Sequence, residues 1–125
     1  MENIAKIINL DDNVEEEVLI KINGVDLVAF ITYSPYLIEI DHEYSVEIVL
    51  FADDVDIKEN NQEEKCLVRD GETFAYTVKG FLNQMGQLDV GFLIEDEIFD
   101  DYEYLYEKYI TLKVDRIDLE FVDKD

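Results

Sequence analysis

The sequence predicts a mainly β protein, a single antiparallel barrel or sandwich of about six strands with at most short helices. Three observations favour this class. Apolar and polar residues alternate along several segments, Asn-Gly and Asp-Gly pairs separate such segments, and helical spacing of apolar residues is rare. A length of 125 residues fits one domain, so residues 1–125 are expected to form a single acidic β-rich domain.

The clearest predicted hairpin turns at Asn23-Gly24, between two segments of alternating apolar residues. A two-residue type I′ turn needs positive φ at both central positions, which Asn and Gly tolerate. The register that follows pairs Ile22 with Val25, Lys21 with Asp26, and Ile20 with Leu27. Apolar pairs then fall on one face and an opposite-charge pair on the other, which suits a half-buried hairpin.

A second hairpin is predicted at Asp70-Gly71, between strands at 66–69 and 72–79. The same turn geometry sets Arg69 opposite Glu72, and Leu67 opposite Phe74. An exposed pair such as Arg69 and Glu72 contributes about 0.2–1 kcal/mol.

Alternation also predicts strands near 44–51, 88–95 and 109–122, and Pro35 is expected to end the strand that precedes the first of them. The apolar positions of 109–122 change parity midway, so one strand with a bulge near Asp115-Arg116 is expected there. A long bulged strand is common where a sheet curls into a barrel.

The remaining segments carry weaker signals. Residues 1–10 fit a short helix or a strand, 37–40 a short strand or a turn entry, 52–65 a loop with at most one helical turn, and 100–108 a short helix after an Asp cap. The strand spacing is compatible with an OB-like barrel, whose insert between the third and fourth strands often carries a helix. This is an analogy of fold and fixes no function.

The charge balance narrows the choice of partner. Thirty-two Asp and Glu face ten Lys and Arg, which gives a net charge of -22, yet 48% of the residues are hydrophobic. Disordered acidic tails lack such hydrophobicity, so the chain is expected to fold. Its negative field argues against direct binding to nucleic acid or an anionic membrane, because both are polyanions. It favours a basic protein, a cation or simple solubility.

Cysteine usage and the absence of apolar runs predict a cytoplasmic protein. A single cysteine, Cys66, forbids an internal disulfide and fits a reducing compartment. Residues 1–10 hold no apolar run long enough for a signal peptide, and no stretch approaches the roughly 20 apolar residues of a membrane span. The oligomeric state is left open.

Catalytic and metal-binding patterns are weak, so no enzyme, cofactor or specific metal site is predicted. His42 and Ser45 are close in sequence but lack a nucleophile-elbow pattern, and Cys66 sits among acids that disfavour its thiolate. The acid clusters at 41–43 and 53–56 match neither a calcium loop nor zinc spacing, and no Gly-rich phosphate loop occurs. Paired carboxylates for glycoside chemistry cannot be picked out among 32 acids.

One segment combines acids with aromatics and is the predicted partner-binding site. Its residues are Glu95, Asp96, Glu97, Phe99, Asp100, Asp101, Tyr102, Glu103, Tyr104, Tyr106 and Glu107. Tyr offers rigid contact area with a polar tip, and carboxylates around it suit Arg and Lys of a basic protein. The competing interpretation is that these aromatics plug one end of the barrel while the acids are solvated.

The predicted function is therefore a non-catalytic acidic module that binds and neutralises a basic protein. Small acidic immunity proteins and nucleic-acid mimics share this size and charge, although no motif of either is present. The alternative is a structural or adaptor domain whose acidity serves solubility, and a metal protein or enzyme ranks third.

Overall fold

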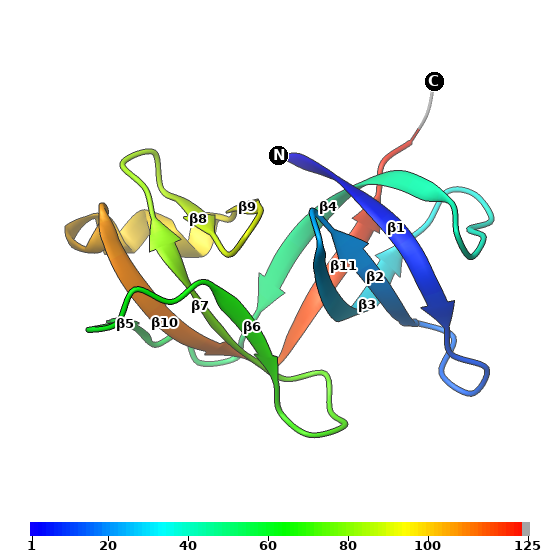
Figure 1. The fold of residues 1–125 in the computed structure, drawn as a ribbon, viewed down its shortest axis with the longest axis horizontal. Coiled ribbons are helices and arrows are strands. Elements are labelled where there is room, and N and C mark those ends of the chain that lie inside the picture. Colours follow the sequence, from blue (N-terminus) through cyan, green and yellow to red (C-terminus); the bar gives the residue numbers. More distant parts are fainter. Residues whose placement is uncertain (124–125) are drawn as a thin grey trace.

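The computed structural model describes residues 1–123, which form eleven β-strands and one 3₁₀ helix in two sheets (Figure 1). This confirms the mainly β class with one short helix. The strands outnumber the roughly six expected, because the segments predicted as single strands at 88–95 and 109–122 are each two strands, and because Ile57–Glu59 forms a strand in a predicted loop. A strand of three residues has too few alternating positions to be recognised.

Five strands form a ring that closes on itself in the order β1-β2-β3-β11-β4. Their bounds are β1 Glu2–Leu10, β2 Glu17–Ile22, β3 Val25–Tyr33, β4 Glu43–Phe51 and β11 Arg116–Phe121. All neighbours in the ring are antiparallel except β3 and β11, which run parallel. The segment 1–10 is thus a strand, and β3 ends two residues before Pro35, as predicted.

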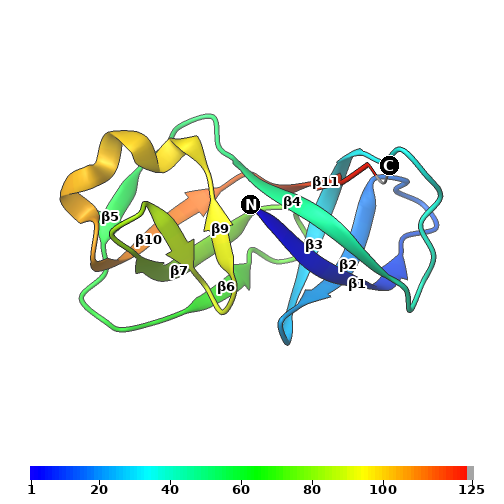
Figure 2. The same ribbon diagram turned by 90° about the horizontal axis from the view of Figure 1, so that it is seen from above.

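The second sheet is formed by the chain between β4 and β11 and lies beside the ring (Figure 2). Its order is β5-β10-β7-β8-β9, and β6 also pairs with β7. The bounds are β5 Ile57–Glu59, β6 Cys66–Arg69, β7 Tyr76–Leu82, β8 Gln87–Asp89, β9 Leu93–Glu95 and β10 Lys108–Val114. The 3₁₀ helix η1, Glu97–Leu105, connects β9 to β10; it begins close to the ring and runs away from it along this sheet (Figure 2).

The hairpin at Asn23-Gly24 has the predicted register. Ile22 pairs with Val25, Lys21 with Asp26, and Ile20 with Leu27. Both turn residues have positive φ, 49° and 81°, as a type I′ turn requires. The Lys21 ammonium lies 3.5 Å from the Asp26 carboxylate on the exposed face.

The register predicted for the second hairpin is wrong. Arg69 pairs with Tyr76 and Leu67 with Val78, so residues 70–75 form a longer loop. The Thr73 N–H and hydroxyl both donate to the Asp70 carbonyl, at 3.2 and 2.6 Å, which folds the loop on itself. The Arg69 guanidinium donates to the carbonyls of Thr73 and Glu72 instead of meeting the Glu72 carboxylate.

The predicted long strand at 109–122 is also wrong. It is two strands in different sheets: β10 pairs with β5 and β7, whereas β11 pairs with β3 and β4. The chain crosses between the sheets at Asp115, whose N–H donates to the Phe51 carbonyl at 2.8 Å. The change of parity therefore marks a change of sheet rather than a bulge.

The alternating segment near 88–95 is a hairpin rather than one strand. β8 and β9 pair directly, with Leu88 opposite Ile94, and the chain turns at Gly91, where φ is 111°. The alternating apolar residues are buried all the same, because Leu88, Val90, Phe92 and Ile94 are at most 6% exposed. Residues 37–40 form no strand, and 52–65 is a loop apart from β5.

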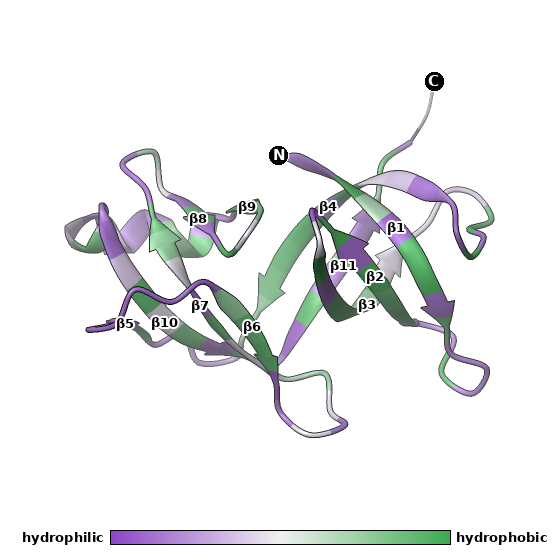
Figure 3. Ribbon diagram, viewed as in Figure 1, coloured by the Kyte–Doolittle hydropathy of each residue, from purple (hydrophilic) through white to green (hydrophobic). Residues whose placement is uncertain are grey.

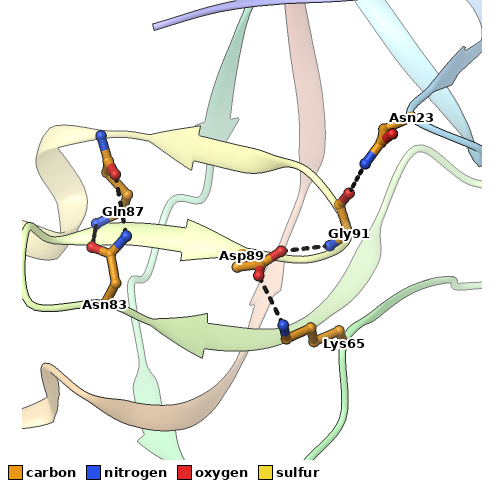
Figure 4. Close-up of polar contacts among 6 residues, drawn as sticks. All are labelled: Asn23, Lys65, Asn83, Gln87, Asp89 and Gly91. Carbon is orange, nitrogen blue, oxygen red and sulfur yellow. Dashed lines mark hydrogen bonds and ion pairs between the residues drawn. The ribbon is translucent and has the colours of Figure 1, made fainter.

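Apolar side chains of both sheets form a continuous buried core. Figure 3 shows apolar residues concentrated on the strands, with hydrophilic residues in the connecting loops. Within residues 1–123, four hydrogen bonds that involve a side chain join the ring to the second sheet and helix. They run from Val28 N to Tyr76 Oη, Asn3 Nδ2 to the Leu93 carbonyl, Asn23 Nδ2 to the Gly91 carbonyl and Leu50 N to Asp96 Oδ2, at 2.6–3.0 Å (Figure 4 shows the third). These bonds fix where helix η1 stands relative to the ring.

Candidate functional site

Helix η1 begins after Asp96, which caps it. The Asp96 backbone is extended, with φ of -149°, and its Oδ1 accepts a hydrogen bond from Ile98 N at 3.1 Å. The expected short helix is present but starts earlier than residue 100, because Asp96 supplies the cap. The same carboxylate also binds the Leu50 N–H, so Asp96 serves to position the helix.

Three aromatic residues of the segment hold the helix against the core. Phe99 is fully buried, while Tyr102 and Tyr106 are half-buried and pack on the core. Tyr102 Oη donates to the Val55 carbonyl at 3.4 Å. Desolvation, and then the charges of Glu103 and Asp100, raise the pKa of Tyr106. These three rings stabilise the helix, as in the interpretation that they plug the fold.

The outward side of the helix carries the charge. Six carboxylates and one aromatic ring are exposed on it and on the residues that flank it, and we call them the acidic face: Glu95, Glu97, Asp100, Asp101, Glu103, Tyr104 and Glu107. Tyr104 is 69% exposed. Within residues 1–123, no Lys or Arg forms an ion pair with these acids, and Glu95 alone meets a cation, the Met1 amino group at 3.8 Å.

A hollow of about 540 Å³ lies beside the acidic face, where the helix start meets the ring. Glu95, Glu97 and Asp100 line it together with Val49 of β4 and Met85 of the β7–β8 turn. Val49 and Met85 could not be predicted as part of this site, because they come from segments far apart in the chain. Met85 is 73% exposed, which adds apolar contact area next to the carboxylates.

Four other acids in and beside the strands of the second sheet are paired with lysines. The pairs are Lys58–Asp56, Lys65–Asp89, Lys79–Glu64 and Lys108–Glu59, with N···O distances of 2.8–3.5 Å. Burial opposes ionisation of Asp89, but Lys65 and the Gly91 N–H outweigh it and lower the pKa of that carboxyl (Figure 4). The lysines of this sheet therefore neutralise local acids and leave the acidic face uncompensated.

The other candidate groups lie apart from this face. His42 is an exposed loop residue 3.3 Å from the Glu39 carboxylate, and Cys66 is half-buried at the start of β6. In the part of the chain that the structure describes, no three His, Cys, Asp or Glu side chains gather as metal ligands. No helix among residues 1–123 is long and apolar enough to cross a membrane.

Fold and surface together define a small two-sheet β protein with an acidic face that pairs with no Lys or Arg among residues 1–123. Over residues 1–122 the chain matches the family described as Uncharacterised conserved protein UCP019853, and it belongs to that family. No curated protein and no solved structure matches it.

Proposed function

We propose that the protein is a non-catalytic acidic binding module that neutralises a basic protein, in the manner of an immunity protein or a nucleic-acid mimic. One observation carries the proposal: the acidic face holds six exposed carboxylates that no Lys or Arg among residues 1–123 offsets. Uncompensated like charges repel one another and oppose compaction. A basic partner would relieve that repulsion, and the field would speed its approach.

Contact area for such a partner comes from two exposed side chains. Tyr104 projects from the acidic face and Met85 from the adjoining turn, at 69% and 73% exposure. Aromatic residues and Met are enriched in interface cores, and the flexible Met side chain can adapt to the shape of a partner. Arg and Lys of the partner would then meet Asp101, Glu103 and Glu107 around Tyr104.

As part of this proposal, the ring is OB-like. Its order, with β11 antiparallel to β4 and parallel to β3, is that of a five-stranded Greek-key barrel. The insert follows the fourth ring strand instead of the third, and its Tyr76 hydroxyl accepts a hydrogen bond from Val28 of β3. OB-folds use strands two and three and the loop after strand four to bind oligonucleotides. An acidic barrel of this kind, with a second sheet after its fourth strand, would bind a basic protein in place of an oligonucleotide.

The experiment is capture of a partner from the native host at low salt, its identification, and titration of the purified pair. The test variant is Asp101→Lys, Glu103→Lys, Glu107→Lys. The matched control, Glu63→Lys, Asp70→Lys, Glu72→Lys, makes the same charge change at exposed acids outside the face. The proposal expects lost binding in the test variant and retained binding in the control; equal affinities of the two variants would refute it.

A second candidate is a structural or adaptor domain whose acidity serves solubility. The burial of Phe99 and the packing of Tyr102 and Tyr106 favour it, because these rings serve the fold. Under this candidate, the acidic-face variant leaves the cellular phenotype unchanged. In either case we propose a cytoplasmic location, which the single cysteine supports.

A further inference from the structure

A second hollow, of about 590 Å³, lies at the end of the ring away from the second sheet. The β1–β2 loop and the segment after β3 form it, and both lie at the far right of Figures 1 and 2. Its apolar walls include Leu10, Ile31 and Ile38, which pack against the core from the surface. At its rim stands Leu37, which is 93% exposed. A leucine so exposed beside a hollow offers apolar area that the fold does not use.

Hydrogen bonds hold these walls in place. The Ile31 N–H donates to the Glu16 carbonyl at 2.8 Å, which ties the β1–β2 loop to β3. On the other side, the Ser34 hydroxyl donates to the Tyr36 carbonyl at 2.6 Å, and Tyr36 Oη donates to the Val122 carbonyl at 3.0 Å. The hollow is therefore formed before any partner arrives, which lowers the entropy cost of binding.

The rim of the hollow is anionic. Asp11, Glu15 and Glu16 line one side, and the sequence holds no Lys or Arg from 22 to 57 or from 7 to 20. The N–H groups of Val14 and Asn13 donate to the Asp11 carboxylate, both at 2.8 Å, and they lower the pKa of that group. An apolar floor with a fixed negative rim complements an apolar side chain that is flanked by cations.

We propose that this hollow binds a segment of a basic protein in which a large apolar side chain is flanked by Lys or Arg. A second copy of this chain is the poorer occupant, because it also has a net charge of -22 and would be repelled by the anionic rim. The inference does not depend on the acidic face, which lies at the opposite end of the molecule. Either surface can fail its test while the other passes.

The test uses defined peptides and the full chain labelled with ¹⁵N. One probe is acetyl-Lys-Lys-Leu-Leu-Lys-Lys-amide, and its control has both leucines replaced by serine at equal charge. The leucine peptide is expected to shift the amide signals of Leu10, Ile31 and Leu37 and to bind about tenfold more tightly than the control. Equal affinity of the two peptides, or shifts confined to other parts of the surface, would overturn the proposal.

Two variants assign the binding to this hollow. Leu37→Ser should weaken the leucine peptide about tenfold, because a wholly exposed side chain can be truncated without loss of the fold. Met85→Ser truncates the exposed apolar residue of the other hollow and should leave the affinity unchanged. Equal effects of the two variants would contradict the assignment. Sedimentation that shows dimers lost in Leu37→Ser would replace the basic partner with a second copy.

Discussion

The Asp96 carboxylate accepts a hydrogen bond from the Leu50 backbone N–H at 2.8 Å and joins the start of helix η1 to strand β4 of the ring. Its other oxygen accepts from Ile98 N and caps the helix. One side chain thus sets both where the helix begins and where it stands against the ring. The position of the acidic face relative to the ring therefore depends on Asp96.

Replacing Asp96 should loosen the acidic face and destabilise the protein. Asp96→Ala removes a cap and a hydrogen bond between the sheets, so we expect a loss of about 1–3 kcal/mol in the free energy of unfolding. Asp101→Ala removes an exposed acid that neither caps the helix nor bonds the ring, so it should change the free energy of unfolding by less than about 0.5 kcal/mol. Urea denaturation of both variants measures the difference, and similar midpoints would count against this role of Asp96.

A second prediction concerns the buried and exposed aromatic rings of helix η1. Phe99→Ala should cost about 3–5 kcal/mol, because a fully buried ring is lost. Tyr104→Ser should change the free energy of unfolding by less than about 0.5 kcal/mol, because Tyr104 is exposed. Thermal melts compare the two variants. A large loss in Tyr104→Ser would show that this ring belongs to the core.

Arg116 provides a third prediction, at the junction of the sheets. Its guanidinium lies 4.4 Å from the ring centroid of Phe30 and 4.7 Å from that of Phe51, and it donates to the buried Asp118 carboxylate at 2.6 Å. Arg116→Ala leaves that carboxylate without its cation, so about 1.5–3 kcal/mol should be lost. Lys113→Ala, on exposed β10 surface, is the control, and chemical denaturation that finds equal losses would refute the assignment.

The Lys65–Asp89 contact predicts a pH dependence. The pKa of Asp89 is lowered in the folded state, so its contribution to stability is fully present above the ordinary value of 3.8. The contribution is lost as pH falls through the folded pKa. Asp89→Asn should therefore be less stable than the wild type near neutral pH, and the gap should close in acid. Denaturation from about pH 1.5 to pH 7 covers the range in which Asp89 takes up its proton; a gap that is constant over this whole range would rule it out.

The sequence predicts features that local chemistry decides. The register at Asn23-Gly24 follows from the φ values that two adjacent residues tolerate. The hairpin around Asp70-Gly71 is present, but its predicted register is wrong, because Thr73 and Arg69 donate to the loop's own carbonyls, which the dipeptide does not reveal. The prediction of one long strand at 109–122 is wrong because the sheet that each half joins depends on distant partners, such as Phe51, which accepts a hydrogen bond from Asp115.

The candidate site divides in the same way. The acids and Tyr104 can be found as a composition bias, and in the structure these side chains are exposed. The roles of Asp96 and Val49 could not be found in this way, because each depends on a segment that is distant in the chain. Asp96, for example, bonds Leu50, which lies 46 residues earlier. The burial of Phe99 does not follow from the sequence, because the pattern of aromatics fits either face of a short helix.

The central claim is that the acidic face binds a basic protein through its charge. The most direct test is the dissociation constant of the purified complex, measured by calorimetry between 50 and 500 mM salt. The Debye length is about 10 Å at 0.1 M salt, so the attraction between charges is progressively screened over this range. The account predicts affinity that falls steeply with salt in the wild type and is already weak in Asp101→Lys, Glu103→Lys, Glu107→Lys. Affinity that stays constant across this range would contradict it.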